Sequence, residues 1–321
     1  MAQQTLKVGV IMDPIDAITP KKDSSLAMLL EASRRGHEIH YFEQHDLSIR
    51  AGEPEGVSRL LTVRDDNADW FDLGESSRLN LGDLDVILMR KDPPFDMEYI
   101  YTTYILDRAA LKGALIVNAP EALRNINEKA YTAWFPDLTP LTLITRSMDE
   151  MRSFLADNEH VVIKPLDGMG GKSIFVIRKG DNNANVVFET LTNYGTRFAM
   201  AQTFLPEISE GDKRILLIDG EPVPYALARI PPADDNRGNL VMGATGRGQP
   251  LSERDLEICA HVGPVLREHG VIFAGIDVIG DSLTEVNVTS PTGIRELDRE
   301  FGLNIAGLMF DAIEARLSSP Q

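Results

Sequence analysis

The stretch 161–171 limits the folds open to this chain more than any other segment. It reads VVIKPLDGMGG, an apolar run that ends in Lys164 and then breaks into Gly168, Gly170 and Gly171. The pattern predicts a strand that delivers a cation to the edge of a glycine loop. Glycines let backbone N–H groups approach an anion closely, and the lysine adds a point charge. The stretch predicts either a phosphate-binding hairpin or an ordinary hairpin with a solvated lysine.

Two better known phosphate loops are excluded by spacing. A Walker A motif ending in Gly171-Lys172-Ser173 would need a glycine at the position of Leu166. A dinucleotide-binding fingerprint would need a glycine in place of Ser173, and residues 173–177 are typical of a strand, not of a helix. What remains is a strand, a glycine loop and a second strand that together close over a nucleotide.

Length and charge narrow the classes of function. The 321 residues suffice for about two or more domains, and a net charge of −17 disfavours binding to nucleic acid or to an anionic membrane. The single cysteine, Cys259, cannot form an internal disulfide, which fits a reducing compartment. The N-terminus shows no secretion signal, and no apolar run approaches the roughly 18 residues needed to span a bilayer. We therefore expect a cytoplasmic protein without a nucleic acid or membrane partner.

Residues 1–123 predict an N-terminal domain with an open parallel α/β sheet. Apolar periodicity indicates strands at 6–12, 37–42, 84–89 and 114–117, helices at 24–36 and 99–112, and weaker strands near 60–63 and Trp70. Pro120 is well placed as the first residue of a short helix that runs to about Asn125. Ligands of such sheets collect beyond the carboxyl ends of strands, which is where Arg90 and Lys91 stand. The two side chains either hold a substrate carboxylate or are solvated loop charges; the two prolines that follow favour binding.

Residues 124–202 predict a smaller central α+β module. The pattern indicates a strand near Thr142, a helix at 148–158, the glycine hairpin, a helix at 187–194 and a strand at 198–207 that leaves the module. This last strand lies beside the glycine hairpin, where its backbone and apolar side chains would suit an adenine. A plain edge strand is the alternative.

Residues 203–321 predict an antiparallel-sheet domain. Its first hairpin turns at Asp219-Gly220, which would pair Arg214 with Tyr225 and place Arg214 and Arg229 on one face. The following segment, 231–248, contains four glycines and two prolines and is expected to be a mobile lid. A helix capped by Ser252 and ended by Gly270 follows.

The second hairpin, 272–279 with 283–288, would bring three oxygen ligands together. If Gly280-Asp281-Ser282 is the turn, Asp277 lies opposite Glu285, and Asn287 shares their face. A turn of Gly280-Asp281 alone would put the two acids on opposite faces. Carboxylates opposite each other repel unless a cation lies between them, and Mg²⁺ takes carboxylate and amide oxygens. We favour a magnesium site, with Mn²⁺ as a substitute ion, over a solvated polar face.

These parts together predict phosphoryl transfer, which depends mainly on positioning and electrostatic stabilisation. The chain also closely resembles prokaryotic glutathione synthetase, a family of ATP-grasp ligases. The resemblance runs through nearly the whole chain and is carried by MRKDPPFD at 89–96, NEK at 127–129, KPLDGMGG at 164–171, GDKR at 211–214, LARIP at 227–231, RGNL at 237–240 and TEVNVTSPT at 284–292.

The resemblance implies an ATP-grasp architecture and ATP-dependent ligation of γ-glutamylcysteine to glycine through an acyl phosphate, giving glutathione, ADP and phosphate. It also implies a homotetramer. Site residues carried over by position are Lys129, Lys164, Gly168, Gly170, Gly171, Gln202, Phe204, Leu205 and Asp212 for ATP, Asp277, Glu285 and Asn287 for magnesium, Arg214 and Arg229 for catalysis, and Arg90, Ser290 and Thr292 for substrate. The alternatives are another carboxylate-amine (dipeptide) ligase of this fold and a nucleotide-binding module without catalysis.

Overall fold

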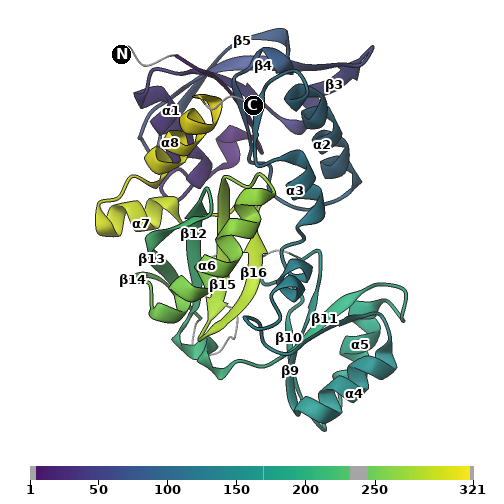
Figure 1. The fold of residues 1–321 in the computed structure, drawn as a ribbon. Coiled ribbons are helices and arrows are strands. Elements are labelled where there is room, and N and C mark those ends of the chain that lie inside the picture. Colours follow the sequence, from purple (N-terminus) through teal and green to yellow (C-terminus); the bar gives the residue numbers. More distant parts are fainter. Residues whose placement is uncertain (1–4, 169, 232–244, 319–321) are drawn as a thin grey trace.

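The computed structural model describes residues 5–168, 170–231 and 245–318, which form three sheets (Figure 1). The first sheet lies at one end of the elongated molecule and the third lies in its middle. The second sheet lies at the other end, connected to the rest by narrow crossings of the chain. No helix within the described ranges is long and apolar enough to cross a membrane.

The first sheet has seven strands in the order β3-β4-β2-β1-β6-β7, with β5 paired to β4. The strands are β1 Lys7–Ile11, β2 Glu38–Phe42, β3 Leu47–Arg50, β4 Glu53–Val63, β5 Phe71–Asn80, β6 Val86–Met89 and β7 Leu115–Val117. The four strands β2, β1, β6 and β7 are parallel, whereas β3, β4 and β5 are antiparallel additions. The predicted open parallel sheet is confirmed for these four strands, and it continues at one edge into antiparallel strands whose orientation was not predicted.

The antiparallel extension is hard to recognise because its residues lack the usual composition of strands. Pro54 and Gly56 fall within β4, and β5 is mostly exposed and polar. The alternating burial of β4 nevertheless follows the period of two that a strand with one buried face requires. Gly52, with a φ of 86°, makes the tight turn from β3 into β4.

Four helices pack on this sheet: α1 Ser24–Arg34, α2 Met97–Ala110, α3 Pro120–Asn125 and the C-terminal α8 Ile305–Ser318. Asp23 caps α1 by accepting the N–H of Leu26 at 2.6 Å, and Pro120 opens α3 as its position predicts. α8 returns from the far end of the sequence to lie beside α1 (Figure 1), where Arg35 donates to the carbonyl of Gly307 at 2.8 Å.

The central sheet has the order β10-β9-β11-β8 and is covered by two helices. The elements are β8 Thr142–Thr145, α4 Met148–Asn158, β9 His160–Pro165, β10 Phe175–Arg178, α5 Ala184–Thr192 and β11 Ala199–Thr203. The predicted glycine hairpin is confirmed, because β9 pairs with β10 in antiparallel register from Ile163 opposite Phe175. β11 lies between β9 and β8, so the alternative of an edge strand is wrong.

The third sheet is antiparallel, as predicted, in the order β14-β13-β12-β15-β16. Its strands and helices are β12 Asp212–Ile218, β13 Glu221–Ile230, β14 Thr245–Pro250, α6 Glu253–Glu268, β15 Phe273–Ile279, β16 Ser282–Asn287 and α7 Ile294–Phe301. β14 pairs with β13, so the expected lid does not extend to residue 248. The rest of that predicted lid, 232–244 with Arg237, lies outside the described residues.

Bulges shift the register of both hairpins in this sheet. Ile218 lies opposite Glu221 as predicted. An irregularity between Ile215 and Leu217 then places Arg214 opposite Leu227 instead of Tyr225. A shift of two residues preserves the face of a strand, because side chains alternate with a period of two. Arg214 and Arg229 therefore share a face although the predicted pairing is wrong.

The second hairpin reaches the predicted pairing by a different route. Its turn is Gly280-Asp281 alone, since Ile279 lies opposite Ser282 and Val278 opposite Leu283. Thr284 is then an extra residue that has no partner in the register, and Asp277 lies opposite Glu285. The predicted three-residue turn is wrong, but the predicted pairing of Asp277 with Glu285 is confirmed.

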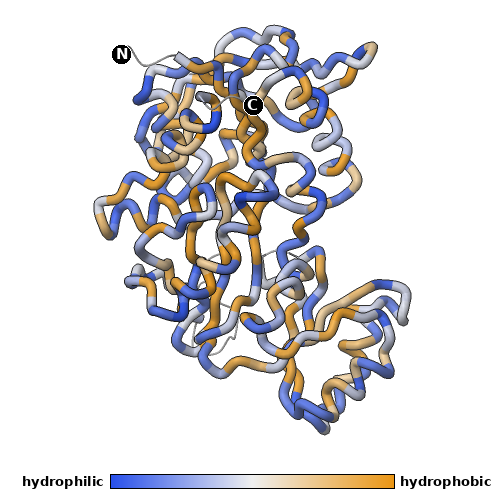
Figure 2. Tube along the Cα trace, viewed as in Figure 1, coloured by the Kyte–Doolittle hydropathy of each residue, from blue (hydrophilic) through white to orange (hydrophobic). Residues whose placement is uncertain are grey.

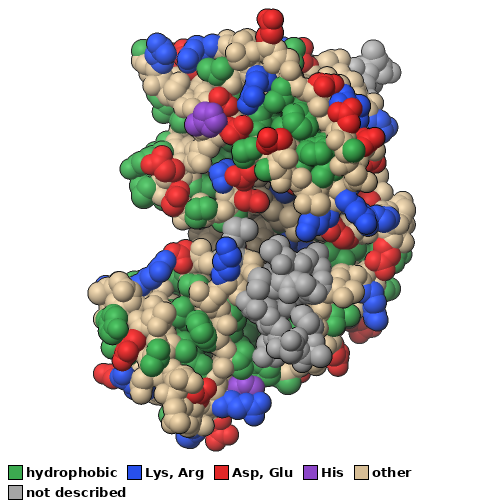
Figure 3. Space-filling model, turned by 180° about the vertical axis from the view of Figure 1, so that it is seen from behind, with side chains coloured by type: hydrophobic (Ala, Val, Ile, Leu, Met, Phe, Trp, Pro, Cys, Tyr) green, Lys and Arg blue, Asp and Glu red, His purple; other side chains and the backbone are tan. Residues whose placement is uncertain are grey.

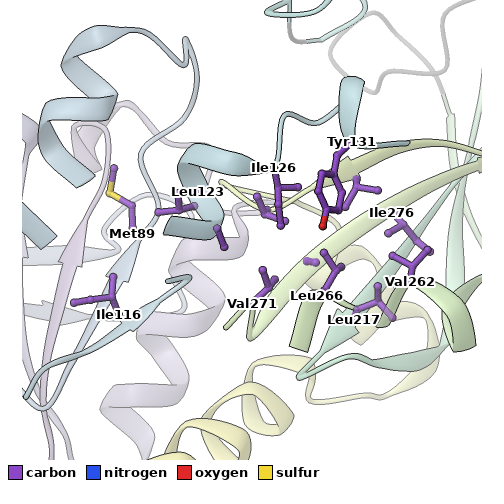
Figure 4. Packing of buried hydrophobic residues seen from close by; sticks show 14 of the residues in the cluster. Met89, Ile116, Leu123, Ile126, Tyr131, Leu217, Val262, Leu266, Val271 and Ile276 are labelled. Atoms are coloured by element: carbon purple, nitrogen blue, oxygen red, sulfur yellow. The ribbon is translucent and has the colours of Figure 1, made fainter. Parts of the chain in front are cut away.

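Hydrophobic residues follow the strands through the interior of the molecule (Figure 2). One core cluster runs from Met89 and Ile116 in the first sheet through Leu123 and Val271 to Ile276 in the third (Figure 4). A second cluster likewise joins both sheets, whereas the core of the central module contains only residues of that module. The first and third sheets thus share their hydrophobic cores, and the central module has its own.

Candidate functional site

Two adjoining cavities lie where the central module meets the third sheet, and a deep indentation between the two lobes is visible in Figure 3. The first cavity has a volume of about 90 Å³ and the second of about 210 Å³. Ile174 and Glu285 line both. The cavities therefore form one continuous site with an inner and an outer part.

The first cavity brings together most residues predicted to hold the nucleotide base and ribose. Gln202, Phe204, Leu205 and Asp212 line it, and so does Lys164. Its remaining walls are largely apolar, with Val162, Val176, Ile208 and Ile279 among them. An apolar slot with a few polar groups is the usual form of a site for a flat heterocycle.

Lys164 is delivered to this site by the end of β9, where it lies opposite Met200 of β11. The side chain is 6% exposed, and its ammonium donates to the carbonyl of Thr284 at 3.5 Å. Burial lowers the pKa of Lys164 despite the nearby Glu285. Among the described residues no carboxylate contacts this ammonium directly, and such a buried cation is well suited to receive an anionic ligand.

Lys129 lies on the opposite side, beside the glycine loop. Its ammonium donates to the carbonyl of Gly168 at 2.6 Å, pairs with Glu128, and lies 3.6 Å from Glu285. Burial alone would lower the pKa of Lys129, but Glu285 and Glu128 outweigh it and hold that pKa above its ordinary value. The lysine therefore stays charged and ties the glycine loop to the third sheet.

The three predicted glycines line the second cavity. Gly170 and Gly171 have φ values of 66° and 75°, which residues with a Cβ rarely adopt. Glu128 also lines this cavity and was not among the predicted site residues. Burial and the charge of Glu285 raise the pKa of Glu128 to about 7. Its position directly before Lys129 in the NEK segment was the only signal for it.

Arg214 and Arg229 line the second cavity and converge on one carboxylate. Nη2 of Arg214 lies 2.9 Å, and Nη2 of Arg229 lies 2.8 Å, from Oδ2 of Asp277. Burial would raise the pKa of Asp277, but the two arginines outweigh it and hold it well below its usual range. Arg229 also pairs with Asp212, whose pKa burial nevertheless raises to about 7.

The donor set fits a divalent cation only in part. Glu285 and Asn287 line the second cavity, but Asp277 is 2% exposed and faces the two arginines. Asp277, predicted to hold the metal together with Glu285 and Asn287, contacts Arg214 and Arg229 in this structure, and its role as a metal ligand stays a prediction. Arg214 and Arg229 neutralise the first acid, and Lys129 lies beside the second. Within the described residues no cluster of three or more His, Cys, Asp or Glu has a geometry suited to a metal.

The candidate substrate residues fall into two groups. Ser290 and Thr292 line the second cavity. Arg90 lies one layer behind this wall, 6% exposed, where it donates to Ser25 Oγ and to the carbonyl of Pro291, both at 3.0 Å. Its guanidinium also stands 5.5 Å from the ring centroid of Phe273. The structure therefore connects Arg90 to the cavity through the loop that carries Ser290 and Thr292.

Two family models match the chain. The model for the N-terminal domain of prokaryotic glutathione synthetase matches residues 6–124, and the model for the ATP-grasp domain of the same enzymes matches residues 128–302. The glutathione synthetase of Escherichia coli (strain K12) is 56% identical over 312 residues, covering 97% of this chain and 99% of that protein. The glutathione synthetase of Vibrio parahaemolyticus is 54% identical with the same coverage.

Solved structures share the fold at much lower identity. D-cycloserine synthetase DcsG superposes with a TM-score of 0.67 at 15% identity, covering 97% of this chain and all of that one. The ATP-grasp ligase PsnB, solved with a minimal precursor, Mg and ADP, gives 0.61 at 15% over 97% and 98% of the chains. D-alanyl-alanine synthetase A of Vibrio cholerae gives 0.59 at 12% over 98% and 99%. These three likenesses establish the fold alone.

Proposed function

The chain belongs to the prokaryotic glutathione synthetase family, and from that membership we propose which of its residues carry out the ligation. It is an ATP-grasp ligase that forms glutathione at the expense of ATP. Enzymes of this family use ATP with Mg²⁺. The two substrates that we propose this enzyme ligates are γ-glutamylcysteine and glycine.

In the proposed reaction a carboxylate oxygen of the cysteinyl residue attacks the γ-phosphorus of ATP, and ADP leaves. The glycine amine then attacks the carbonyl carbon of the acyl phosphate, loses a proton, and expels phosphate from the tetrahedral intermediate. Both steps place negative charge on oxygens outside water, where fixed cations are most effective. The chain must therefore supply several buried positive groups around one cavity.

Arg214 and Arg229 are the groups that we assign to the acyl phosphate and the oxyanion. The single observation that carries this assignment is that Asp277 holds both guanidinium groups while both still line the second cavity. Two arginines fixed by a shared carboxylate are preorganised, so little reorganisation is needed as charge develops. Arg90 supports the substrate from behind this wall, and Ser290 and Thr292 contact it directly.

ATP occupies the first cavity and extends its phosphates into the second. Gln202, Phe204, Leu205 and Asp212 hold the adenine and ribose, and Lys129, Lys164 and the glycine loop hold the phosphates. Glu285 and Asn287 supply oxygen ligands to Mg²⁺, or to Mn²⁺ in its place, with Asp277 behind them orienting the arginines. The bound ion neutralises charge on the phosphates, as metal ions do in phosphoryl transfer.

The remaining proposals rest on the sequence and on resemblance. We divide the chain at residues 1–123, 124–202 and 203–321, since each part contributes one sheet, although α8 returns to the first. The segment 232–244, outside the described residues, would shield the acyl phosphate from water. We also propose that the protein is a cytoplasmic homotetramer. A molar mass of one chain in light scattering would refute the proposed tetramer.

Replacement of Lys164 tests the assignment of the site. Lys164→Ala should lower turnover on the order of a hundredfold with the fold retained, as for other charge-stabilising donors. Lys179→Ala is the matched control, because Lys179 is an exposed lysine just beyond the same hairpin whose ammonium donates to the carbonyl of Ala156. Phosphate release is measured with both substrates and with each omitted in turn. Near-normal turnover of Lys164→Ala would defeat the assignment.

Metal binding is tested separately from turnover. Titration of Mn²⁺ by electron paramagnetic resonance in the presence of ADP should show weaker binding in Glu285→Gln and in Asn287→Ala than in the unchanged chain. Each variant loses one of the oxygen ligands assigned to the ion. Unchanged Mn²⁺ affinity in both variants would contradict the proposed ligands even if activity fell.

A further inference from the structure

The chain that follows β16 leaves the third sheet and becomes a wall of the second cavity. The ladder between β15 and β16 stops at Gly275 opposite Asn287. In a continued ladder Phe273 would lie opposite Thr289. Residues 289–292 instead line the cavity, and they include the proposed substrate contacts Ser290 and Thr292. The end of pairing between β15 and β16 therefore requires a structural cause.

Asn118 occupies the place where the two strands separate. It follows β7 in the first sheet and is 3% exposed. Its Oδ1 accepts the N–H groups of Ile272 and Phe273 at 2.8 and 2.9 Å. Its Nδ2 donates to the carbonyls of Phe273 and Val288 at 2.7 and 2.6 Å. One side-chain amide thus makes four hydrogen bonds to the backbone at the open end of the hairpin.

These bonds replace the next rung of the ladder. Because Nδ2 of Asn118 bridges the carbonyls of Phe273 and Val288, the two strands are held apart by an inserted amide instead of pairing with each other. Only an amide side chain offers two donors and a two-fold acceptor within this length. Asn118 therefore fixes both strand ends at once and directs residue 289 away from the sheet.

The diverted chain is then held by the first domain at several points. Ser24 Oγ accepts the N–H groups of Gly293 and Ile294 at 3.2 and 3.3 Å, and Ser290 Oγ donates to Asp92 at 2.5 Å. Arg90 holds the carbonyl of Pro291. Asn118 is the first of these anchors along the path of the loop. The anchors come from the N-terminal domain, whereas the base and ribose contacts come from the other two sheets.

We propose that Asn118 is a positioning residue for the ligation, which sets the place of Ser290 and Thr292 and thereby the affinity for the peptide or amine substrate but not for ATP. The inference rests on the proposed function of those two residues. No residue of 288–292 lines the first cavity, so the nucleotide should be insensitive to a change at Asn118. The predicted signature is a selective rise in the KM of one co-substrate.

Asn118→Asp tests this directly because the two side chains have the same shape. The carboxylate keeps the acceptor for Ile272 and Phe273 but has no donor for the carbonyls of Phe273 and Val288. We expect the KM for γ-glutamylcysteine or glycine to rise at least about tenfold, because two hydrogen bonds are lost, and the KM for ATP to stay within about twofold. Asn118→Ala, which removes all four bonds, should show the same selectivity with a larger rise.

Protonation supplies a second readout. A protonated aspartic acid regains one O–H donor, so the KM ratio of Asn118→Asp to the unchanged chain should fall as the pH is lowered from 8 to 6. Leu29→Ala is the control for general destabilisation, because Leu29 is fully buried in the second core cluster and lines neither cavity. It should lower the melting temperature without a selective change in KM.

The outcomes separate the inference from the function on which it rests. If Ser290→Ala and Thr292→Ala leave the KM of both co-substrates unchanged, the proposed substrate wall is wrong. If those variants raise the KM but Asn118→Asp and Asn118→Ala do not, the inference about Asn118 is wrong. An equal rise in the KM for ATP, or a KM ratio that does not change with pH, would also overturn it.

Discussion

The structure predicts that the substitution Asp277→Asn lowers the stability of the protein strongly. The carboxylate is 2% exposed and pairs with Arg214 and Arg229, which are 7% and 6% exposed. Asparagine has nearly the same volume, so the change creates no cavity and removes only the negative charge. Two buried guanidinium groups then share one partially charged oxygen.

Removing one partner of a buried ion pair destabilises a protein by about 3–5 kcal/mol, because the other charge remains buried without compensation. At roughly 2–4 °C per kcal/mol for domains of this size, the melting temperature should fall by roughly 6–20 °C. Combining Asp277→Asn with Arg214→Met should restore part of this loss, since the guanidinium that then remains, that of Arg229, is still paired with Asp212. The free energy of unfolding is measured by urea denaturation followed by circular dichroism.

Glu221→Gln is the matched control. Glu221 pairs with Arg267 at 2.6 Å, but the two side chains are 76% and 44% exposed. An exposed pair of this kind contributes about 0–1 kcal/mol. If Asp277→Asn destabilises the chain no more than Glu221→Gln, the two arginines do not depend on Asp277 for their charge compensation, and the reasoning fails.

Three further predictions concern other parts of the molecule. Lys129→Met should raise the Kd for ATP at least about tenfold in calorimetry, because Glu128 and Glu285 lose their cation and repel the phosphates; an unchanged Kd would contradict this. Burial raises the pKa of Asp298 from 3.8 to about 6, so the stability that its protonated form contributes is lost as the pH rises through 6. Asp298→Asn should flatten the urea-derived stability between pH 4 and 7, and an unaltered slope would count against it. Gly248→Ala would place a Cβ 2.2 Å from Phe301, so amide exchange in β14 should accelerate, whereas Gly74→Ala, with 3.5 Å to its nearest neighbour, should not affect it.

The helices and their ends could be predicted from the sequence because their signals are local. The boundaries of α4 and α3 agree with the predicted ones, since Ser147 caps the first and Pro120 opens the second within a few residues of the helix itself. The parallel strands of the first sheet were recognisable for a related reason: strands buried on both faces read as continuous apolar runs. Strands β3 and β5 carry no such run.

The registers could not be predicted because they depend on the packing of whole elements. The bulges near Leu217 and at Thr284 leave no mark in the turn sequences, and each shifts the pairing that the turn alone would give. The convergence of Arg214 and Arg229 was still predictable, since the shift preserved their face. Asn118 acts through contacts distant in sequence, and Glu128 lies in the site because the fold brings it near Glu285, so neither a spacing nor a periodicity pointed to them.

The extra residue at Thr284 has a consequence for how the central module is seated. Thr284 has no partner in the register of its own sheet. Its carbonyl instead accepts a hydrogen bond from the ammonium of Lys164, which belongs to the neighbouring central sheet. The bulge in the third sheet thus provides a contact point for the central sheet. Removing Thr284 would make the ladder regular and leave Glu285 opposite Asp277, but it would take away the carbonyl that the ammonium of Lys164 contacts.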